Sequence, residues 1–221
     1  MLNFRNITKS YNNGKNKNIV LDSAQISIDR NDICLIKGMS GVGKSTLLNI
    51  IGCLIKPDNG ELTFNQKSIS LLDDNEKFRL SNFSYVFQDY NLLPEFTVYQ
   101  NLLIPAYINN LDINSIKNKV DDLLIYMNVD HLKDSYPSLI SHGEKQRISI
   151  LRSLLGKQEI ILADEPTGNL DEINTKIILD LIVKINKELN YTFIIVSHDS
   201  SFEKIATNIY GIEKKKIIKY E

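Results

Sequence analysis

Gly38-Met39-Ser40-Gly41-Val42-Gly43-Lys44-Ser45-Thr46 is the stretch of sequence that decides the fold. It matches the pattern G-x-x-x-x-G-K-[ST] of a phosphate-binding loop, or P-loop. A short apolar run, Ile33–Ile36, precedes it, and a stretch with helical character, Ser45–Leu54, follows it. A short run that is apolar throughout is typical of a strand buried on both faces. The sequence therefore predicts a strand, a glycine-rich loop and a helix in succession.

The chemistry of phosphate binding explains the residue types in this loop. Glycines allow the backbone to curl so that successive N–H groups converge on phosphate oxygens, and the start of the helix adds partial positive charge. We expect Lys44 to reach the β- and γ-phosphates of a nucleotide and the Ser45 hydroxyl to bind Mg²⁺.

Polar groups also follow two other apolar strands. Asp164-Glu165 comes directly after Ile160–Ala163, and His198 follows Phe193–Val196. Ligands of doubly wound sheets bind at such strand ends. We expect Asp164 to orient Mg²⁺ through its water shell, Glu165 to polarise an attacking water and His198 to sense the γ-phosphate. The alternative is structural, because acidic pairs often end strands or cap helices, and a lone histidine at a strand end is more often structural than catalytic.

Composition excludes several classes of protein. The 221 residues include 26 Lys+Arg and 27 Asp+Glu, a net charge of −1, with no basic block of the kind that binds nucleic acid. No apolar run approaches the roughly 18 residues of a membrane-spanning helix, and the first residues lack a signal core, so we expect a cytosolic location. Cys34 and Cys53 are too few for a zinc site, and we expect buried thiols without a disulfide.

Strands and helices alternate along most of the chain, which predicts a mostly parallel α/β sheet. A helical middle part predicts an inserted subdomain, and the last two strands predict a hairpin. A polar turn is expected at Asn12–Asn18, between the first two strands. The expected strands are Leu2–Thr8, Ile19–Ile28, Ile33–Ile36, Glu61–Phe64, Glu159–Ala163, Thr192–Val196, Ile209–Ile212 and Lys216–Tyr220. The expected helices are Ser45–Leu54, Val98–Met127 (interrupted at Asn109-Asn110 and capped by Asn114), Gly143–Leu155 and Asn174–Leu189.

The order of the motifs resembles one family over nearly the whole chain, the ATP-binding cassette (ABC) ATPases. After the P-loop, Tyr85-Val86-Phe87-Gln88-Asp89 resembles the family's Q-loop. Ser141-His142-Gly143-Glu144-Lys145-Gln146-Arg147 resembles its signature motif. The Asp164-Glu165 pair follows, then Asn169-Leu170-Asp171 as the D-loop and His198 as the switch histidine.

The resemblance implies an α/β fold with a P-loop NTPase (RecA-like) core and a mostly parallel sheet. It adds an N-terminal antiparallel β portion and an inserted α-helical subdomain. Residues 1–221 would form a single ABC ATPase domain. Within it, residues 1–88 and 150–221 would build the nucleotide-binding core and residues 89–149 the helical signature subdomain.

The resemblance also implies a role for each matching residue, with ATP and Mg²⁺ as cofactors. Tyr11 would stack on adenine, although a tyrosine in a surface turn is the alternative. Gln88 would contact Mg²⁺ or the attacking water and report the nucleotide state to the helical subdomain. Glu165 would be the general base, His198 would contact the γ-phosphate, and Lys44 would complete the catalytic set.

The family works as a head-to-tail dimer that encloses two ATP molecules. Ser141, Gly143 and Glu144 of one subunit would therefore complete the ATP site on the other subunit's P-loop. Asp171 would lie at the seam of the dimer. The partner chain would be a second copy or a related ATPase.

Two stretches resemble the branch of lipoprotein-release and macrolide-exporter ATPases: Ala163–Asp171, and Phe87–Pro94 followed by Thr97-Val98. The resemblance thus implies an ATPase that drives a separate integral membrane permease, an exporter of peptide, drug or lipoprotein type. Such a subunit is cytoplasmic and attached through the permease to the inner face of the membrane. A groove at residues 88–110 would receive the permease, partly through Tyr90, Leu92, Leu93 and Phe96. A regulatory ATPase of the cell-division type is the alternative, and a soluble non-transport member or a P-loop kinase fits less well.

His142 is the main departure from the family pattern, which has glycine at this position. Glycine gives backbone freedom that histidine lacks. We expect the ring to point to solvent and to leave the Ser141 and Gly143 contacts intact. The alternative is that His142 weakens ATP-driven closure or makes it sensitive to pH.

Overall fold

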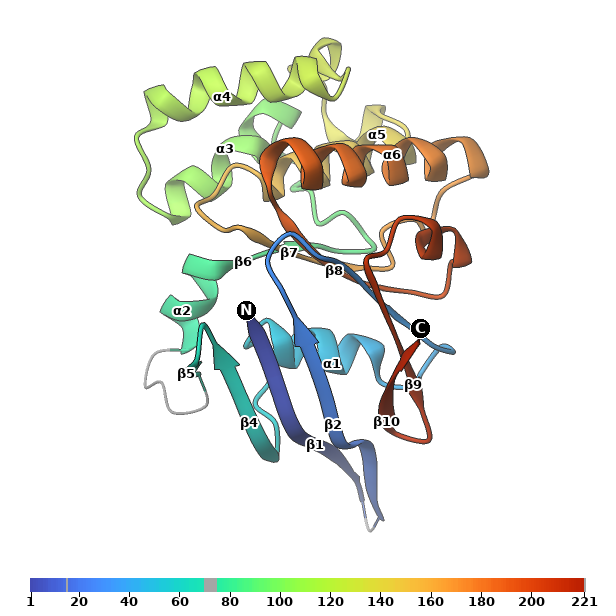
Figure 1. Cartoon of the computed structure of the whole chain (residues 1–221). Helices are drawn as coiled ribbons and strands as arrows, with labels where there is room; N and C mark the ends of the chain where they lie inside the picture. Colours follow the sequence, from blue (N-terminus) through green and yellow to red (C-terminus); the bar gives the residue numbers. More distant parts are fainter. Residues whose placement is uncertain (15, 70–74, 221) are drawn as a thin grey trace.

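Two β-sheets with a helix between them form the nucleotide-binding part of the molecule, and further helices cover the outer face of the larger sheet (Figure 1). The computed structural model describes residues 1–14, 16–69 and 75–220. The larger sheet has the strand order β10-β9-β3-β8-β7-β6 and the smaller one the order β2-β1-β4-β5. In chain order the strands are β1 (Leu2–Asn13), β2 (Asn16–Ile28), β3 (Ile33–Lys37), β4 (Asn59–Phe64), β5 (Lys67–Ser68), β6 (Phe83–Val86), β7 (Ile160–Asp164), β8 (Thr192–Ser197), β9 (Asn208–Glu213) and β10 (Lys216–Tyr220).

The six-stranded sheet confirms the predicted mostly parallel α/β core. Strands β9, β3, β8, β7 and β6 run parallel to their neighbours, and only the terminal strand β10 pairs antiparallel. All six residues of β8 are buried, which is why this strand reads as a continuous apolar run. The four-stranded sheet is antiparallel throughout, as the predicted N-terminal β portion requires.

Alternate side chains of the larger sheet pack into two separate apolar cores, one on each face of the sheet. Ile36 and Ile194 belong to the core that also contains α1 (Lys44–Ile51) and the inner face of the smaller sheet. Leu35 and Ile195 point to the opposite core, beneath the covering helices. Successive strand residues face opposite sides of a sheet, so each strand contributes to both cores. The P-loop helix α1 lies between the two sheets, because it shares one core with both of them.

The covering helices are α3 (Val98–Ile108), α4 (Ile113–Tyr126), α5 (His142–Ser153) and α6 (Glu172–Leu189). Asp112, and not the expected Asn114, caps α4, because its carboxylate accepts the N–H groups of Asn114 and Ser115. The predicted domain boundary at residues 149 and 150 falls inside α5, so the division into core and helical subdomain stays a prediction.

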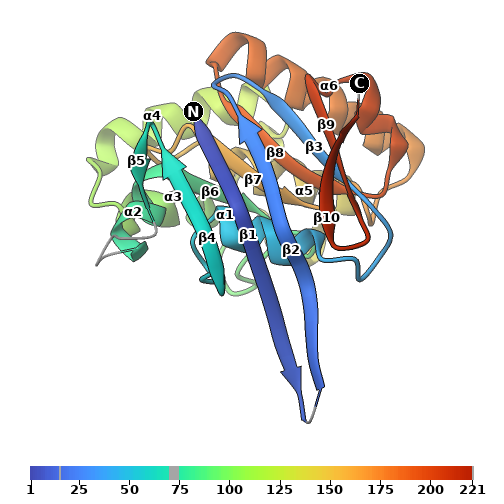
Figure 2. The same cartoon turned by 60° about the horizontal axis from the view of Figure 1, so that its bottom comes forward.

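Strands β1 and β2 form a long hairpin that extends beyond the rest of the smaller sheet (Figure 2). The expected turn at Asn12–Asn18 is wrong in extent, because strand pairing continues to Asn13 and Asn16. Polar residues at the end of a hairpin can still form strand pairs, because the apolar residues earlier in the same two strands have already fixed the register.

Among the described strands and α-helices, three escaped the sequence analysis: β5, β6 and α2 (Asn75–Asn82). They are short and lack a clear apolar period. The described part of the chain contains no helix that is long and apolar enough to cross a membrane. Both cysteines are free thiols, as expected; Cys34 is buried and Cys53 partly buried.

Candidate functional site

The P-loop connects β3 to α1 and presents the start of that helix. Gly41 and Gly43 have φ angles of +77° and +112°, a region that side chains with a Cβ rarely adopt. A Cβ on Gly43 would also lie 2.6 Å from Cγ1 of Val20. Gly43 caps α1 without a side-chain hydrogen bond, so the first N–H groups of the helix keep their capacity to bind an anion.

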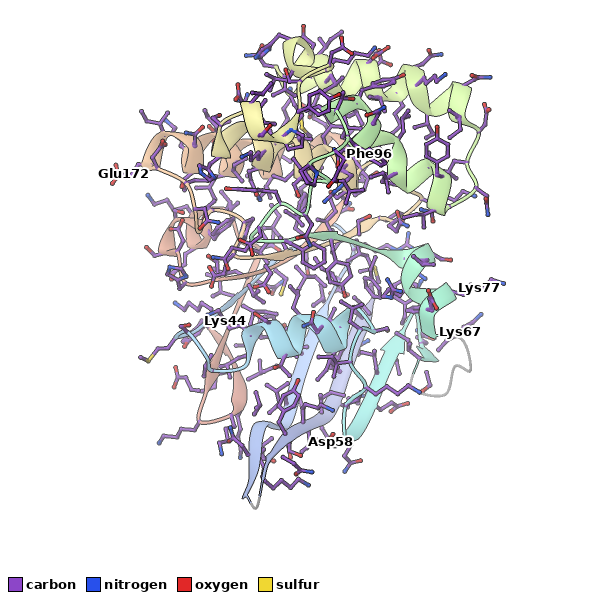
Figure 3. The ribbon with its side chains drawn as sticks, turned by 180° about the vertical axis from the view of Figure 1, so that it is seen from behind. Lys44, Asp58, Lys67, Lys77, Phe96 and Glu172 are labelled. Atoms are coloured by element: carbon purple, nitrogen blue, oxygen red, sulfur yellow. The ribbon has the colours of Figure 1, made fainter. Side chains whose placement is uncertain are left out.

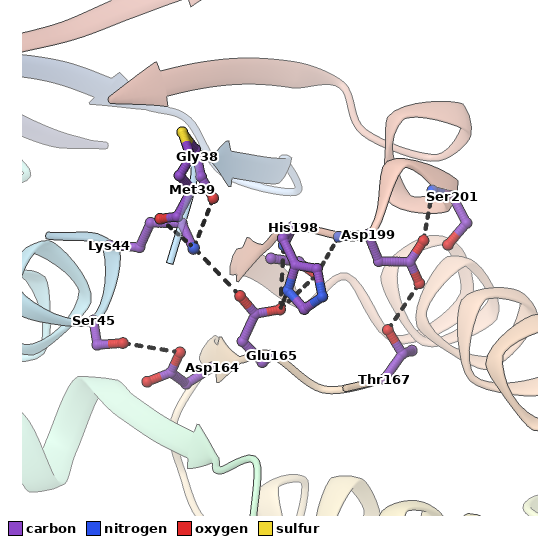
Figure 4. Close-up of polar contacts among 11 residues, drawn as sticks. Gly38, Met39, Lys44, Ser45, Asp164, Glu165, Thr167, His198, Asp199 and Ser201 are labelled. Carbon is purple, nitrogen blue, oxygen red and sulfur yellow. Dashed lines mark hydrogen bonds and ion pairs between the residues drawn. The ribbon is translucent and has the colours of Figure 1, made fainter. Parts of the chain in front are cut away.

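Lys44 is buried in this loop, with 7% of its side chain exposed. Its Nζ atom donates to the carbonyl oxygens of Gly38 at 2.8 Å and Met39 at 3.2 Å. It also lies 3.4 Å from Oε1 of Glu165 (Figure 4). A phosphate that binds Lys44 would therefore compete with these oxygens for the ammonium group.

Ser45 and Asp164 present oxygen atoms side by side, as a Mg²⁺ site requires. The Ser45 hydroxyl donates to Oδ1 of Asp164 at 3.2 Å. Burial raises the pKa of Asp164, while this hydrogen bond acts in the opposite direction. A hydroxyl and a single carboxylate fit Mg²⁺, which keeps most of its ligands as water and phosphate oxygens.

Gln88 does not join these two residues. Its side chain is exposed and lies near Gly168, and its carbonyl oxygen accepts a hydrogen bond from the Asn169 amide at 3.3 Å. Among the described residues, no hydrogen bond connects Gln88 with Ser45 or Asp164. The prediction that Gln88 binds Mg²⁺ therefore stays a prediction.

Glu165 is held as a carboxylate at the carboxyl end of β7, with a φ angle of +45°. Its Oε2 atom accepts hydrogen bonds from the Ser197 hydroxyl at 2.9 Å and from the His198 N–H at 3.2 Å, and it lies 2.9 Å from Nδ1 of His198. Burial alone would raise the pKa of Glu165, but the hydrogen bonds from His198 and Ser197 outweigh it and lower the pKa. An ionised carboxylate at neutral pH is the form that can accept a proton from water.

A second layer of polar contacts supports His198, and the sequence analysis did not assign it. Asp199 accepts hydrogen bonds from the Thr167 hydroxyl at 3.0 Å and from the Ser201 N–H at 2.9 Å, and its own N–H donates to Ser197 (Figure 4). Ser197 and Asp199 flank His198 in the sequence, and this position could have indicated that they support it. No sequence pattern indicated Thr167, because its hydrogen bond to Asp199 joins residues 32 positions apart.

The signature residues lie at the start of α5. The Ser141 hydroxyl caps this helix in a reciprocal capping box with Glu144, and its hydrogen bonds lower the pKa of the Glu144 carboxyl. Gly143 permits close approach of α6, since a Cβ there would lie 2.1 Å from Oδ1 of Asn174. Asp171 caps α6 through the N–H of Asn174 at 2.8 Å. No hydrogen bond or ion pair between described residues joins Ser141 or Gly143 to the P-loop of the same chain.

Tyr11 lies on β1, opposite Asn18 of β2, with 40% of its surface exposed. Its ring packs under the Lys9 ammonium, which is 5.6 Å from the ring centroid. Asp58 anchors this part of the strand, because it accepts hydrogen bonds from the backbone and hydroxyl of Ser10 at 2.8 and 2.5 Å. An exposed, anchored aromatic ring is available to a flat ligand.

The surroundings of His142 and Tyr90 add to what the sequence predicted. His142 is exposed, as expected, and its Nδ1 atom also lies 3.1 Å from the Tyr90 hydroxyl. Tyr90 is only 8% exposed, and Leu92 is partly buried against the core, so neither offers an open surface to a permease. Leu93 and Phe96 are 44% and 41% exposed and remain available.

Comparisons with known proteins agree with this geometry. Residues 21–168 match the family model described as ABC transporter. The chain is 40% identical to the lipoprotein-releasing system ATP-binding protein LolD of Buchnera aphidicola subsp. Schizaphis graminum, over 91% of this chain and 89% of the relative. It is 36% identical to the ABC transporter ATP-binding protein YtrE of Bacillus subtilis (strain 168), over 93% and 91%.

A solved structure has the same fold over the full length. The dimeric ATP-binding cassette MJ0796, in a post-hydrolysis state bound to ADP and Pi, superposes with a TM-score of 0.89. The sequences are 31% identical, and the match covers 100% of this chain and 98% of that one. The resemblance inferred from the order of the motifs is therefore confirmed, and the chain belongs to the ABC transporter family as an ATPase subunit.

Proposed function

We propose that this chain binds ATP with Mg²⁺, hydrolyses it between two cassettes and drives a separate membrane permease of the lipoprotein-release type. One observation carries the catalytic part of the proposal. Lys44, the Ser45–Asp164 pair and the Glu165–His198 pair converge at the carboxyl ends of β3, β7 and β8. That edge of a parallel sheet is where such folds bind ligands.

The geometry supports a division of labour at the phosphate. The start of α1 and Lys44 hold the phosphate oxygens, while Ser45 and Asp164 hold the metal. Mg²⁺, when bound, neutralises charge that develops on the phosphate oxygens. Glu165 accepts a proton from the attacking water, and His198 orients both this carboxylate and the γ-phosphate. Gln88, which lies beside Gly168 and Asn169, would sense the nucleotide.

Closure of two chains around ATP completes each site. Ser141, Gly143 and Glu144 of the partner would contact the nucleotide held by the P-loop, and Asp171 would lie at the seam. The dimeric state of MJ0796 supports this arrangement. Binding drives the closure only to the extent that ATP has a higher affinity for the closed than for the open form. Hydrolysis removes that difference, so the dimer opens.

The substitution Glu165→Gln tests the catalytic assignment. It keeps the shape of the side chain but removes the charge that accepts a proton. We expect ATP to be bound but not hydrolysed, and the variant to form a stable dimer with ATP in size-exclusion chromatography with light scattering. Glu203→Gln is the matched control, because Glu203 pairs with Lys37 outside the reacting centre at 3.0 Å. Hydrolysis by Glu165→Gln at the wild-type rate would exclude Glu165 as the base.

The permease contact is proposed at Leu93 and Phe96, which precede α3 in the chain. Figure 3 shows the position of Phe96. It would hold the chain at the cytoplasmic face of the membrane. The test is co-purification with a permease of the lipoprotein-release type that is expressed together with this chain. Phe96→Asp is expected to abolish it, whereas Ile125→Asp, at a 67% exposed position of α4, should leave it intact. Equal retention by both variants would place the contact elsewhere.

A further inference from the structure

The Q-loop and the signature motif are joined by a hydrogen bond between side chains 52 residues apart. The Tyr90 hydroxyl lies 3.1 Å from Nδ1 of His142, and the ring centroids are 5.9 Å apart. Tyr90 is two residues beyond Gln88, and His142 stands between Ser141 and Gly143. The bond thus connects the segment expected to contact the nucleotide of its own chain with the motif expected to contact the nucleotide of the partner.

The backbone of Tyr90 is fixed to the other end of the same helix. Its carbonyl oxygen accepts hydrogen bonds from Nη2 of Arg152 at 2.7 Å and from the Ser149 hydroxyl at 3.3 Å. Nη1 of Arg152 donates to the carbonyl of Asn91 at 2.6 Å. His142 and Arg152 are ten residues apart, about 15 Å along a helix. The Q-loop segment is therefore attached to α5 at two well separated points.

The Tyr90 phenol can both donate and accept a hydrogen bond, which suits it to connect two motifs. Burial raises its pKa, although a hydrogen bond from the Asn169 side chain opposes this, so the hydroxyl keeps its proton. The hydroxyl therefore has a proton to share with Nδ1 of His142. The Asn169 amide also donates to the carbonyl oxygen of Gln88 at 3.3 Å. The Q-loop therefore contacts the signature motif through Tyr90 and the D-loop through Gln88.

A glycine at position 142, as in the family pattern, would leave the hydroxyl without a partner on α5. We propose that Tyr90 and His142 are a positioning pair that holds the signature motif in register with the Q-loop and so favours closure of the ATP-bound dimer. This inference rests on the proposed head-to-tail dimer. Neither residue acts on the reacting atoms; both act through Ser141 and Gly143, whose placement they fix.

The experiment is a double-mutant cycle in the Glu165→Gln background, where the dimer accumulates. Tyr90→Phe, His142→Gly and the double variant are compared by the ATP-dependent dimer dissociation constant. Loss of one hydrogen bond between neutral groups weakens an equilibrium by about 3- to 10-fold. We expect each single substitution to have this effect and the double variant to be no worse than either one. Binding of ADP to the monomer should not change, since the P-loop is untouched.

Two further variants separate positioning from general stability. His142→Asn places an acceptor oxygen near the position of Nδ1, so it should restore dimerisation when the Tyr90 hydroxyl is present and not in the Tyr90→Phe variant. Tyr126→Phe is the matched control, because the Tyr126 hydroxyl donates to Glu188 at 2.7 Å at the carboxyl ends of α4 and α6, away from the site motifs in the sequence. It should leave dimerisation unchanged.

Three results would overturn the proposal. They are independent, additive losses in the double variant, unchanged dimerisation after Tyr90→Phe, or an equal loss after Tyr126→Phe. Failure of the proposed function gives a different result, because the Glu165→Gln parent would then form no ATP-dependent dimer at all.

Discussion

Glu165→Gln should increase the affinity of the isolated chain for ADP, in addition to its effect on hydrolysis. Lys44 and Glu165 are 7% and 13% exposed, and their charged atoms are 3.4 Å apart. A phosphate must draw the Lys44 ammonium away from this carboxylate. Glu165 is expected to act at the γ-phosphate, which ADP lacks. Its replacement should therefore remove no favourable contact with ADP.

The magnitude follows from the burial of the pair. Coulomb attraction at 3.4 Å is about 5 kcal/mol for an effective dielectric constant of about 20. Most of it is offset by desolvation, and Lys44 also keeps its hydrogen bonds to Gly38 and Met39. The net attraction that a phosphate must overcome is then about 1 to 2 kcal/mol, which lies between the values typical of exposed and of buried ion pairs. This corresponds to roughly 5- to 30-fold tighter binding of ADP.

Isothermal titration calorimetry with ADP and EDTA measures this directly, because EDTA removes the attraction between Mg²⁺ and Glu165. Glu203→Gln removes an equal charge beside the P-loop but releases Lys37 instead of Lys44. It should change ADP affinity less than about twofold. Unchanged ADP affinity of Glu165→Gln would refute the competition between phosphate and Glu165 for Lys44. An equal increase of ADP affinity in both variants would show that only the net charge of the site matters.

Three other perturbations give measurable outcomes. Asp58→Asn should raise the ATP concentration for half-maximal ATPase rate by about two- to fivefold, because Asp58 anchors Ser10 beside Tyr11; unchanged kinetics would separate the anchor from nucleotide binding. Hydrogen bonds from Ser10 lower the pKa of Asp58 to about 2, so its stabilising effect is present above the ordinary aspartate pKa and is lost as pH falls towards 2. The difference in melting temperature between wild type and Asp58→Asn should accordingly shrink between pH 6 and pH 3, and a constant difference would contradict this. Gly143→Ala should lower stability by about 1 kcal/mol in thermal unfolding, because the Asn174 side chain must move and give up its hydrogen bonds to Asp171. The loss should be smaller when Asn174 is already alanine.

The sequence predicted those parts of the site that depend on local patterns. A glycine-rich loop between an apolar strand and a helix has one arrangement, and the carboxyl ends of parallel strands bring Lys44, Asp164 and His198 to one edge. The caps at Ser141 and Asp171 are equally local, although the sequence analysis assigned these residues only to the signature motif and the dimer seam. These features depend on neighbours in the chain.

Contacts between distant segments could not be predicted in the same way. The Tyr90–His142 bond and the Thr167–Asp199 bond join residues 52 and 32 positions apart, and no period or spacing encodes them. The contact of the exposed His142 ring with Tyr90 was missed for this reason. The predicted cap at Asn114 was wrong because two suitable residues stand near the same helix start, and the structure places Asp112 at the capping position.

The central claim is that ATP is hydrolysed between the P-loop of one chain and the signature motif of another. Lys44→Ala disables the first motif and Ser141→Arg the second, so each variant alone should be inactive. In an equal mixture, half of the dimers carry one intact composite site out of two, which predicts recovery of about a quarter of the wild-type ATPase rate. A mixture as inactive as its components would contradict the account, because it would mean that both motifs must act within the same chain.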